Sequence, residues 1–303
     1  MAEHNHHHHT TSQKGKPLFI AITLNLLITV AQVFGGVVSG SLSLIGDALH
    51  NFSDVLSLII SYVANALSGK KSTEKRTFGF KRAQILAAFI NAITLIGISV
   101  FLIIEAVERL IYAQGIVQAG YVIWLAVLGI LVNGASVLLL TTLQKGDSNL
   151  RAAFLHLVGD LVTSFAVLAG GLAMKFYQVY WVDSVITIGV SLYLIIMASQ
   201  LFIHTINVLM QFVPSHLNVR DICERVMKIP GVHSLHHVHL WRLNDDAIHF
   251  EAHVVIQQNI SLSEFDRIKK EVNTMLRTEF EIDHCILQPE FSECADNELV
   301  PQE

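Results

Sequence analysis

Six long apolar stretches constrain the fold of this chain more than any other feature of its sequence. They cover about residues 17–38, 42–67, 83–111, 118–143, 152–174 and 181–207. A bilayer core requires about 20 mainly apolar residues per helix, and each stretch reaches that length. Hydrophobic residues make up 52% of the 303 residues and charged residues only 15%, which is too apolar for an ordinary soluble protein. The sequence therefore predicts a domain of six transmembrane helices over residues 17–207.

The rest of the chain, residues 208–303, has the composition of a soluble domain. Residues 217–229 have the spacing of an amphipathic helix, and "LSEFDRIKKEVNTMLRTEF" forms a second one with Ser261 or Ser263 as its N-cap. "LHHVHLWRL" and "AIHFEAHVVIQ" alternate as two strands around the turn "NDD", and "IDHCILQPE" is a third strand. This αββαβ order predicts a ferredoxin-like sheet with two helices covering one face.

Basic side chains are concentrated on one side of the predicted membrane domain. The connection after the second helix, "SGKKSTEKRTFGFKR", contains six Lys and Arg residues, and Lys14 and Lys16 precede the first helix. The opposite connections offer little beyond Arg109 and Lys175. Because cytoplasmic loops carry the excess of Lys and Arg, both termini are expected in the cytoplasm. The modest length and the short His-rich tail favour a multi-pass protein of the bacterial inner membrane.

Charge and cysteine content exclude several classes of function. The net charge of −5 provides no basic footprint for nucleic acid. Cys223, Cys285 and Cys294 show no paired spacing, which argues against a disulfide framework and is typical of a reducing compartment. The polar N-terminus, residues 1–16, shows no cleavable signal peptide. Its five histidines are interpreted as a natural metal-catching tail instead of an affinity tag, because Asn5 interrupts the run.

Two histidine–aspartate pairs lie among the apolar residues. "GDALHNFSDV", residues 46–55, contains His50 and Asp54, and "FLHLVGDLV", residues 154–162, contains His156 and Asp160. Residues four apart project from the same face of a helix, so each pair presents an imidazole beside a carboxylate. A charged residue in the middle of a bilayer costs about 2.5–3.5 kcal/mol and indicates function. Two facing pairs supply two nitrogen and two oxygen ligands, which suits tetrahedral Zn²⁺ better than Cu⁺ or Mg²⁺.

Other polar residues in the membrane helices have less specific interpretations. Asp47 and Asn51 flank His50, where they could orient the ligands or line a water-filled entrance. Asn25, Asn133 and Asp183 could do the same, or could bond between helices. A packing role is the ordinary explanation for a single buried His or Asp. Matching pairs on two separate helices favour a metal site.

With these motifs the chain resembles the cation diffusion facilitators, close to the zinc-transporting branch that includes bacterial zinc and cobalt–zinc–cadmium efflux proteins and animal zinc transporters. The resemblance rests on the two His-x-x-x-Asp motifs, on "TFGFKR" in the basic loop and on the His-rich αββαβ domain, and it covers nearly the whole chain. It implies a homodimer that exchanges cytoplasmic Zn²⁺ for protons. The implied transport site in each protomer consists of His50, Asp54, His156 and Asp160. A histidine at position 50 implies a preference for Zn²⁺ over Cd²⁺.

The soluble domain contains a second group of candidate ligands. Strand alternation places His237 and His239 on one face of the first strand, with His236 pointing the other way. Several histidines on a soluble surface usually form only a solvated face, but the resemblance implies a regulatory zinc site here. Its candidate ligands are His236, His239, His253, His284 and Glu290, with Cys294 a possible addition. Zinc would then be a ligand of this domain as well as the transported substrate.

The sequence therefore predicts a Zn²⁺/H⁺ antiporter that exports zinc from the cytoplasm by alternating access, and not an enzyme. Metal binding requires a neutral imidazole, so protons and Zn²⁺ compete for His50 and His156. A membrane metalloprotease would need an HExxH helix, which the sequence lacks. A proton-linked cation channel and a membrane-tethered metal sensor stay open as alternatives. The Irving–Williams order and the availability of each metal both affect selectivity, so the sequence does not rank Zn²⁺, Co²⁺, Cd²⁺ and Fe²⁺ as substrates.

Overall fold

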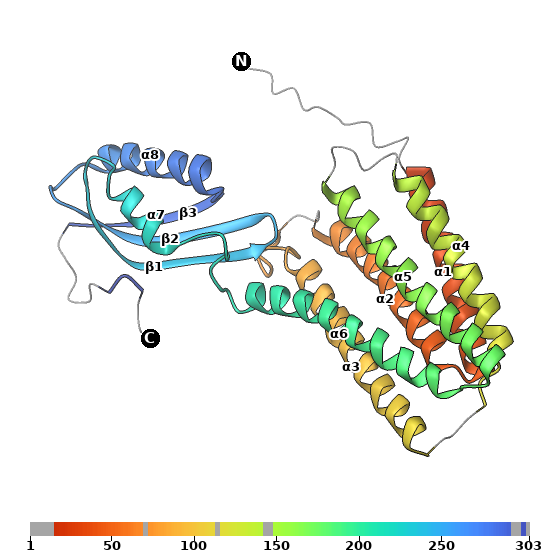
Figure 1. The fold of residues 1–303 in the computed structure, drawn as a ribbon. Helices are drawn as coiled ribbons and strands as arrows, with labels where there is room; N and C mark the ends of the chain where they lie inside the picture. The colour runs from red at the N-terminus through yellow and green to blue at the C-terminus, as the bar shows by residue number, and fades with distance from the viewer. Residues whose placement is uncertain (1–14, 69–71, 113–115, 142–147, 292–297, 301–303) are drawn as a thin grey trace. The chain divides into compact units, whose positions relative to one another are not determined.

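The computed structural model describes residues 15–68, 72–112, 116–141, 148–291 and 298–300. These residues form six long helices, followed by two shorter helices and three strands (Figure 1). The elements are α1 (Gly15–Ser39), α2 (Leu42–Ser68), α3 (Ala83–Tyr112), α4 (Ala119–Thr141), α5 (Ser148–Tyr177), α6 (Trp181–Leu209), α7 (Val219–Val226), β1 (Val232–Asn244), β2 (Ala247–Ile256), α8 (Leu262–Phe280) and β3 (His284–Glu290). The predicted order of six helices followed by αββαβ is confirmed. The chain divides into two compact units, Met1–Ile60 with Ile90–Gln200 and Ser61–Phe89 with Leu201–Glu303.

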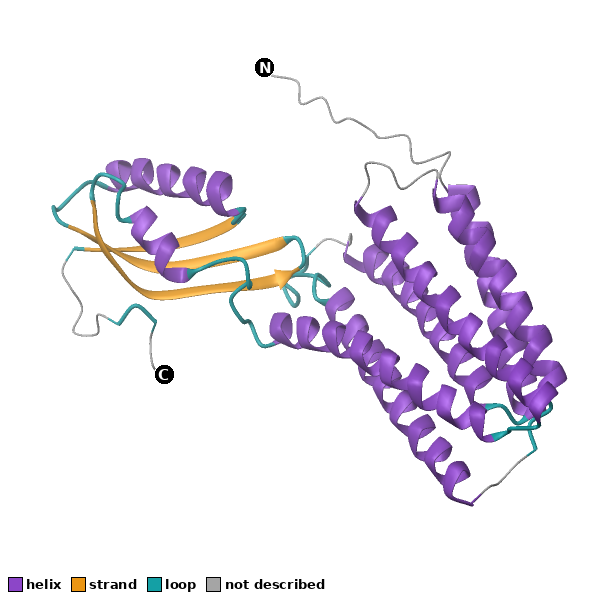
Figure 2. Cartoon of the chain, viewed as in Figure 1, coloured by secondary structure: helices purple, strands orange, loops and turns teal. Residues whose placement is uncertain are grey.

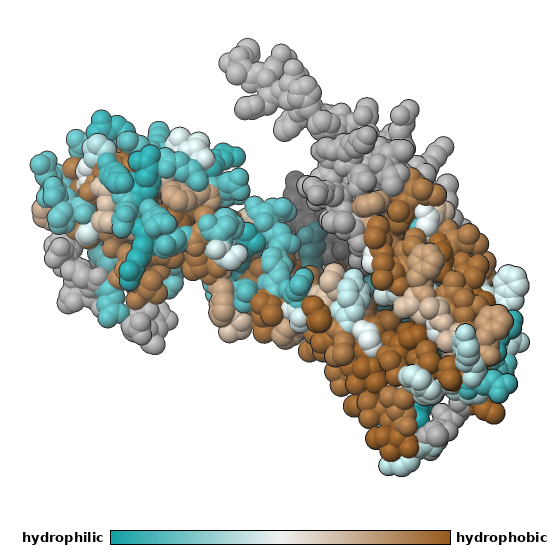
Figure 3. All heavy atoms as spheres, viewed as in Figure 1, coloured by the Kyte–Doolittle hydropathy of each residue, from teal (hydrophilic) through white to brown (hydrophobic). Residues whose placement is uncertain are grey.

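The surface of the long helices is suited to lipid. Within the described residues, four segments are long and apolar enough to cross a membrane, namely Ala83–Tyr112, Ala119–Leu138, Leu157–Tyr177 and Trp181–Leu209. The described apolar part of α1, Asn25–Ser39, is shorter. Large apolar side chains point outward, for example Phe34, which is 74% exposed, and Trp124, which is 71% exposed. Figure 3 shows this apolar surface over the helices, and a patch of this size requires a partner such as the acyl chains of a bilayer.

Close helix packing in the first unit depends on small residues. An added Cβ at Gly171 of α5 would lie 3.0 Å from a side-chain carbon of Ile123 on α4. An added Cβ at Gly36 of α1 would lie 3.2 Å from the backbone nitrogen of Ile45 on α2. Glycines at these positions let neighbouring backbones approach, which is how helices associate where water supplies no hydrophobic force. The result is the group of adjacent helices α1, α2, α4 and α5 seen in Figure 1.

The second unit contains a small mixed sheet with the strand order β1-β2-β3. Strands β1 and β2 are antiparallel, β2 and β3 are parallel, and α7 and α8 cover one face (Figure 2). The core between the layers contains Phe250 and Val254 of β2 with Val272 and Leu276 of α8. Of the two predicted caps for α8, Ser261 is the N-cap and forms a capping box with Glu264.

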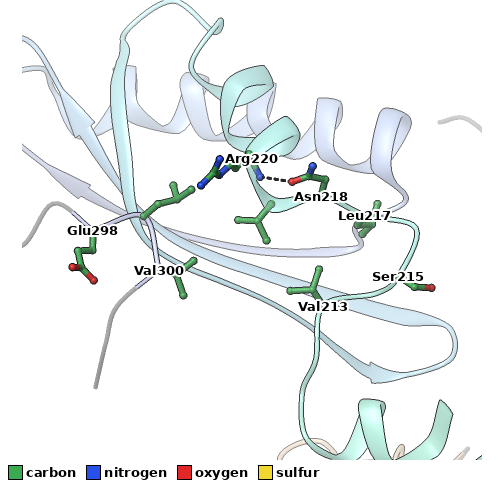
Figure 4. Close-up of a pocket in the computed structure, with 9 residues that line it drawn as sticks. Val213, Ser215, Leu217, Asn218, Arg220, Glu298 and Val300 are labelled. Carbon is green, nitrogen blue, oxygen red and sulfur yellow. Dashed lines mark hydrogen bonds between the residues drawn. The ribbon is translucent and has the colours of Figure 1, made fainter. Parts of the chain in front are cut away.

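The second unit also contains a capped helix beside a surface pocket, and two buried thiols. Asn218 caps α7 by accepting a hydrogen bond from the backbone N–H of Arg220, and both residues line an open surface pocket (Figure 4). Burial raises the pKa of the Cys223 thiol to about 11 and that of Cys285 to about 12, so neither is a reactive thiolate near neutral pH. Cys294, the possible third thiol ligand, lies outside the described residues.

An irregularity in β1 overturns the predicted orientation of His236. The ladder with β2 shifts register between His236 and His239, and His237 adopts a left-handed conformation with φ 51°. The backbone N–H groups of His237 and Val238 donate to carbonyls of Glu298 and Leu299. This β-bulge resets the alternation, so His236 lies opposite His253, on the face away from the helices. The prediction that His236 points away from His237 and His239 was therefore wrong.

The N-terminus of α2 is capped from another helix. Asp183, near the start of α6 and 2% exposed, accepts hydrogen bonds from the backbone N–H of Leu42 at 2.8 Å and from the hydroxyls of Ser41 and Ser43. The first N–H groups of a helix have no partner within it, and a carboxylate also suits the positive end of the helix dipole. Of the two predicted roles of Asp183, bonding between helices is the one observed. The bond holds the helix that carries His50 and Asp54.

Replacing Asp183 with Ala should destabilise the protein by about 1–3 kcal/mol, because buried donors at the start of α2 lose their acceptor. The measurement is the thermal unfolding midpoint of the purified protein in detergent. Glu108→Gln serves as the control, since Glu108 is an exposed carboxylate on α3. Equal midpoints for Asp183→Ala and the control would contradict the capping role.

Candidate metal centres

The first centre lies between α2 and α5. His50 is 5% exposed, and its Nε2 lies 2.9 Å from Oδ1 of Asp160. Its Nδ1 lies 3.6 Å from Oδ2 of Asp54, one turn later on α2. The three residues can each offer one ligand atom so that all three atoms lie within 4.8 Å of one another. A metal ion fits among atoms at such spacing, and one imidazole with two carboxylates is a donor set that Zn²⁺ accepts.

His156, the fourth predicted ligand, occupies α5 one turn before Asp160. Its side chain lies outside the described residues. Of the four predicted transport ligands, the structure thus brings together His50, Asp54 and Asp160. The continuous helix α5 places position 156 on the same helix face as Asp160, since the two are four residues apart.

The second centre lies on the face of the sheet opposite the one that α7 and α8 cover. Nε2 of His236 in β1 lies 3.1 Å from Oε2 of Glu290 in β3, and Nδ1 of His253 in β2 lies 2.9 Å from Oε1 of the same carboxylate. The two imidazole rings meet edge-on with centroids 5.1 Å apart. One side chain from each strand thus converges at one place, and the three form a group that could hold a metal ion.

Two predicted members of the cytoplasmic site lie elsewhere on the sheet. His284 pairs with His249 across β2 and β3, with ring centroids 4.5 Å apart. His249 is four residues before His253, so this pair lies roughly 13 Å along the strand from the three-residue group. His239 pairs with Glu251, and its ring contacts the ring of His237. The structure therefore groups His236, His253 and Glu290 and leaves His239 and His284 apart from them.

The His249–His284 pair has its own surroundings. The ring of His249 stacks on Trp241 with centroids 5.3 Å apart, and Phe78 meets it edge-on. Burial lowers the pKa of His249, and His284, Lys81 and Arg82 add to the effect because each disfavours a further positive charge. These surroundings therefore favour the neutral form of His249.

The chain matches two family models in the order of its two domains. The cation efflux transmembrane domain matches residues 18–210, and the cytoplasmic domain of cation efflux proteins matches residues 214–292. The chain belongs to the cation efflux family. The resemblance seen in the sequence is confirmed, and the long helices belong to a multi-pass membrane domain.

Relatives match this cation efflux protein over most of their length. The metal cation efflux system protein CzcD of Cupriavidus metallidurans is 32% identical over 97% of this chain and 91% of its own. The zinc transporter ZitB of Escherichia coli is 31% identical over 96% of this chain and 92% of its own. A cadmium, cobalt and zinc/H⁺–K⁺ antiporter of Bacillus subtilis is 29% identical over 93% of this chain and 88% of its own.

Several polar residues near the first centre were not singled out from the sequence. Gln32 of α1 and Thr163 and Ser164 of α5 all donate hydrogen bonds to the carboxylate of Asp47. Gln32 lies in the same apolar stretch as Asn25, and nothing in the sequence distinguishes its neutral amide. A Thr-Ser pair in a membrane helix usually bonds to its own backbone. Only the closeness of Thr163 to the Asp160 motif could have indicated them.

The second centre, His236, His253 and Glu290, leads to a prediction for the affinity with which this efflux protein binds zinc. Glu290→Gln and His253→Ala should each weaken binding at this group about tenfold or more, because each removes an atom that the ion would contact. The measurement is equilibrium dialysis of zinc in detergent. His284→Ala and the exposed control His216→Ala should leave the affinity unchanged. A loss in His284→Ala as large as that in Glu290→Gln would contradict the grouping.

Proposed function

We propose that this protein exports Zn²⁺ from the cytoplasm in exchange for protons, by alternating access. The observation that carries the proposal is the buried group of His50, Asp54 and Asp160 between two membrane helices. It is supported by relatives that are named as zinc transporters and as a proton-coupled zinc antiporter. Co²⁺, Cd²⁺ and Fe²⁺ are further candidate substrates, and two relatives are named for cadmium and cobalt.

Charge balance explains why the centre would select a divalent cation. Two ionised carboxylates among apolar helices carry a charge of about −2, which is costly to leave uncompensated. Zn²⁺ neutralises that charge, and His50 adds a nitrogen ligand, with His156 as the proposed fourth. A singly charged ion would leave the centre negative, and an anion would be repelled.

The same ligands explain coupling to protons. Nε2 of His50 lies 2.9 Å from Oδ1 of Asp160, a distance at which the two atoms would share one proton. Zn²⁺ requires the neutral imidazole and the ionised carboxylate, so its arrival releases that proton. After the centre opens to the other side, protons at high concentration compete with the bound metal for the same atoms and displace it. Exchange thus follows from competition at one set of ligands.

The remaining assignments complete the proposal. Residues 17–207 form the transport domain, and residues 208–303 form a cytoplasmic domain that binds zinc and pairs two protomers into a homodimer. The His-rich residues 1–16 precede the transport domain, and nearly all of them lie outside the described residues. Both termini lie in the cytoplasm, and the membrane is the bacterial inner membrane. The His236, His253 and Glu290 group is the proposed regulatory site, since zinc there would bias the conformation of the domain.

The test is zinc uptake into inverted membrane vesicles with an acidic interior, comparing wild type with Asp54→Ala and Asp160→Ala. Wild type should show saturable uptake linked to proton release, and both variants should fall to the level of vesicles without the protein. Glu108→Gln, the exposed carboxylate on α3, should retain wild-type uptake. Unchanged uptake in both Ala variants would overturn the assignment. Flux that does not saturate would favour a channel, and zinc binding without flux would favour a sensor.

A further inference from the structure

A second buried carboxylate lies beside the transport centre and is not one of its ligands. Asp47 is three residues before His50 on α2, and it is 1% exposed. Its hydrogen-bond donors among the described residues are neutral: Nε2 of Gln32 at 3.0 Å, Oγ1 of Thr163 at 3.0 Å and Oγ of Ser164 at 3.3 Å. A carboxylate at this depth is costly to bury, which indicates a function that a smaller apolar residue cannot supply.

The bonds to Asp47 connect the two helices that carry the ligands. Thr163 follows Asp160 by three residues on α5, and its hydroxyl also lies 2.9 Å from the carbonyl oxygen of Asp160. A hydroxyl has one proton, and donation to a carboxylate is stronger than donation to a carbonyl of its own helix. Asp47 thereby ties the turn of α2 that precedes His50 to the turn of α5 that follows Asp160.

Further residues hold this connection in one arrangement. Asn51 donates from Nδ2 to Oε1 of Gln32 at 3.3 Å, which orients the amide of Gln32 so that its nitrogen faces Asp47. On α4, an added Cβ at Gly129 would lie 2.9 Å from that nitrogen, so α4 passes close to the amide. Gln32, Asn51, Thr163 and Ser164 are all buried. The network therefore joins α1, α2 and α5, with α4 packed against it.

We propose that Asp47 is a positioning residue that sets the separation of α2 and α5 at the transport centre, and through it the preference for Zn²⁺ over larger divalent ions. The inference rests on the proposed function. In tetrahedral coordination by Zn²⁺, neighbouring ligand atoms lie roughly 3.3–3.6 Å apart. Nε2 of His50 and Oδ1 of Asp160 lie 2.9 Å apart, which is shorter than this spacing, so zinc requires a small increase. A larger ion such as Cd²⁺ requires a greater separation, which the bonds through Asp47 and Thr163 resist.

The experiment compares Zn²⁺ and Cd²⁺ transport by the full-length protein in proteoliposomes, as the ratio of kcat/KM for the two ions. Thr163→Val keeps the shape of the side chain and removes the bond to Asp47, and Asp47→Asn weakens all three bonds. Each variant should lower the Zn²⁺/Cd²⁺ ratio about tenfold, the size typical of losing a partner that orients a metal ligand. Thr163→Ser keeps the hydroxyl and should retain the wild-type ratio.

Two controls separate positioning from general stability. Thr187→Val is the same substitution at a buried threonine of α6 whose hydroxyl bonds to a carbonyl of its own helix, and it should leave the ratio unchanged. The double variant Asp47→Asn with Gln32→Glu exchanges the carboxylate and the amide, and it should recover most of the ratio lost in Asp47→Asn.

The outcomes distinguish this inference from the function on which it rests. A Zn²⁺/Cd²⁺ ratio that is unchanged in Thr163→Val, whether or not the two fluxes fall together, would overturn the positioning role. Zinc transport by wild type would still support the proposed function. Wild-type protein that moves neither ion would overturn the proposed function, and the inference with it. If Asp47→Asn does not fold, the comparison of Thr163→Val with Thr163→Ser decides the question alone.

Discussion

The cost of an ionised carboxylate away from water governs the organisation of the membrane helices. Asp183 is compensated by the N-terminus of α2, and Asp47 by three neutral donors. Asp160 instead meets an imidazole, whose proton can leave. The donors in the first two arrangements are neutral groups that keep their protons. In the third, the imidazole is a group that can bind either a proton or a metal ion. Similar carboxylates thus have different roles because their partners differ.

The two candidate metal centres combine similar ligands on different supports. His50 and Asp160 come from separate membrane helices, α2 and α5. His236, His253 and Glu290 come from neighbouring strands, whose spacing a ladder of hydrogen bonds maintains. Movement of neighbouring helices against such a centre can open it to one side of a membrane at a time, as alternating access requires. A sheet holds its ligands at constant spacing, which suits a site whose occupancy follows the concentration of the ion without movement of the ligands.

Periodic features of the sequence predicted most of the fold and singled out the three residues that the first centre brings together. The helices follow from apolar length, and the grouping of His50 with Asp54 follows from helical spacing. Contacts between distant segments were beyond such reasoning. The bulge at His237 depends on bonds to Glu298 and Leu299, some sixty residues later. The separation of His284 from His253 depends on the register between β2 and β3. Gln32 gave no signal because a single polar residue in an apolar helix is common.

The network around Asp47 also limits how the transport centre can open. Gln32, Asp47 and Thr163 join α1, α2 and α5 directly beside the ligands, so separating these helices would expose buried donors and a buried carboxylate. The described bonds from α2 to α3 and α6 each use a single side chain of the other helix. Ser53 of α2 donates to Asn91 of α3, and the backbone N–H of Leu42 at the start of α2 donates to Asp183 of α6. Motion of α3 and α6 against a joined group of α1, α2 and α5 would therefore leave the buried network around Asp47 intact.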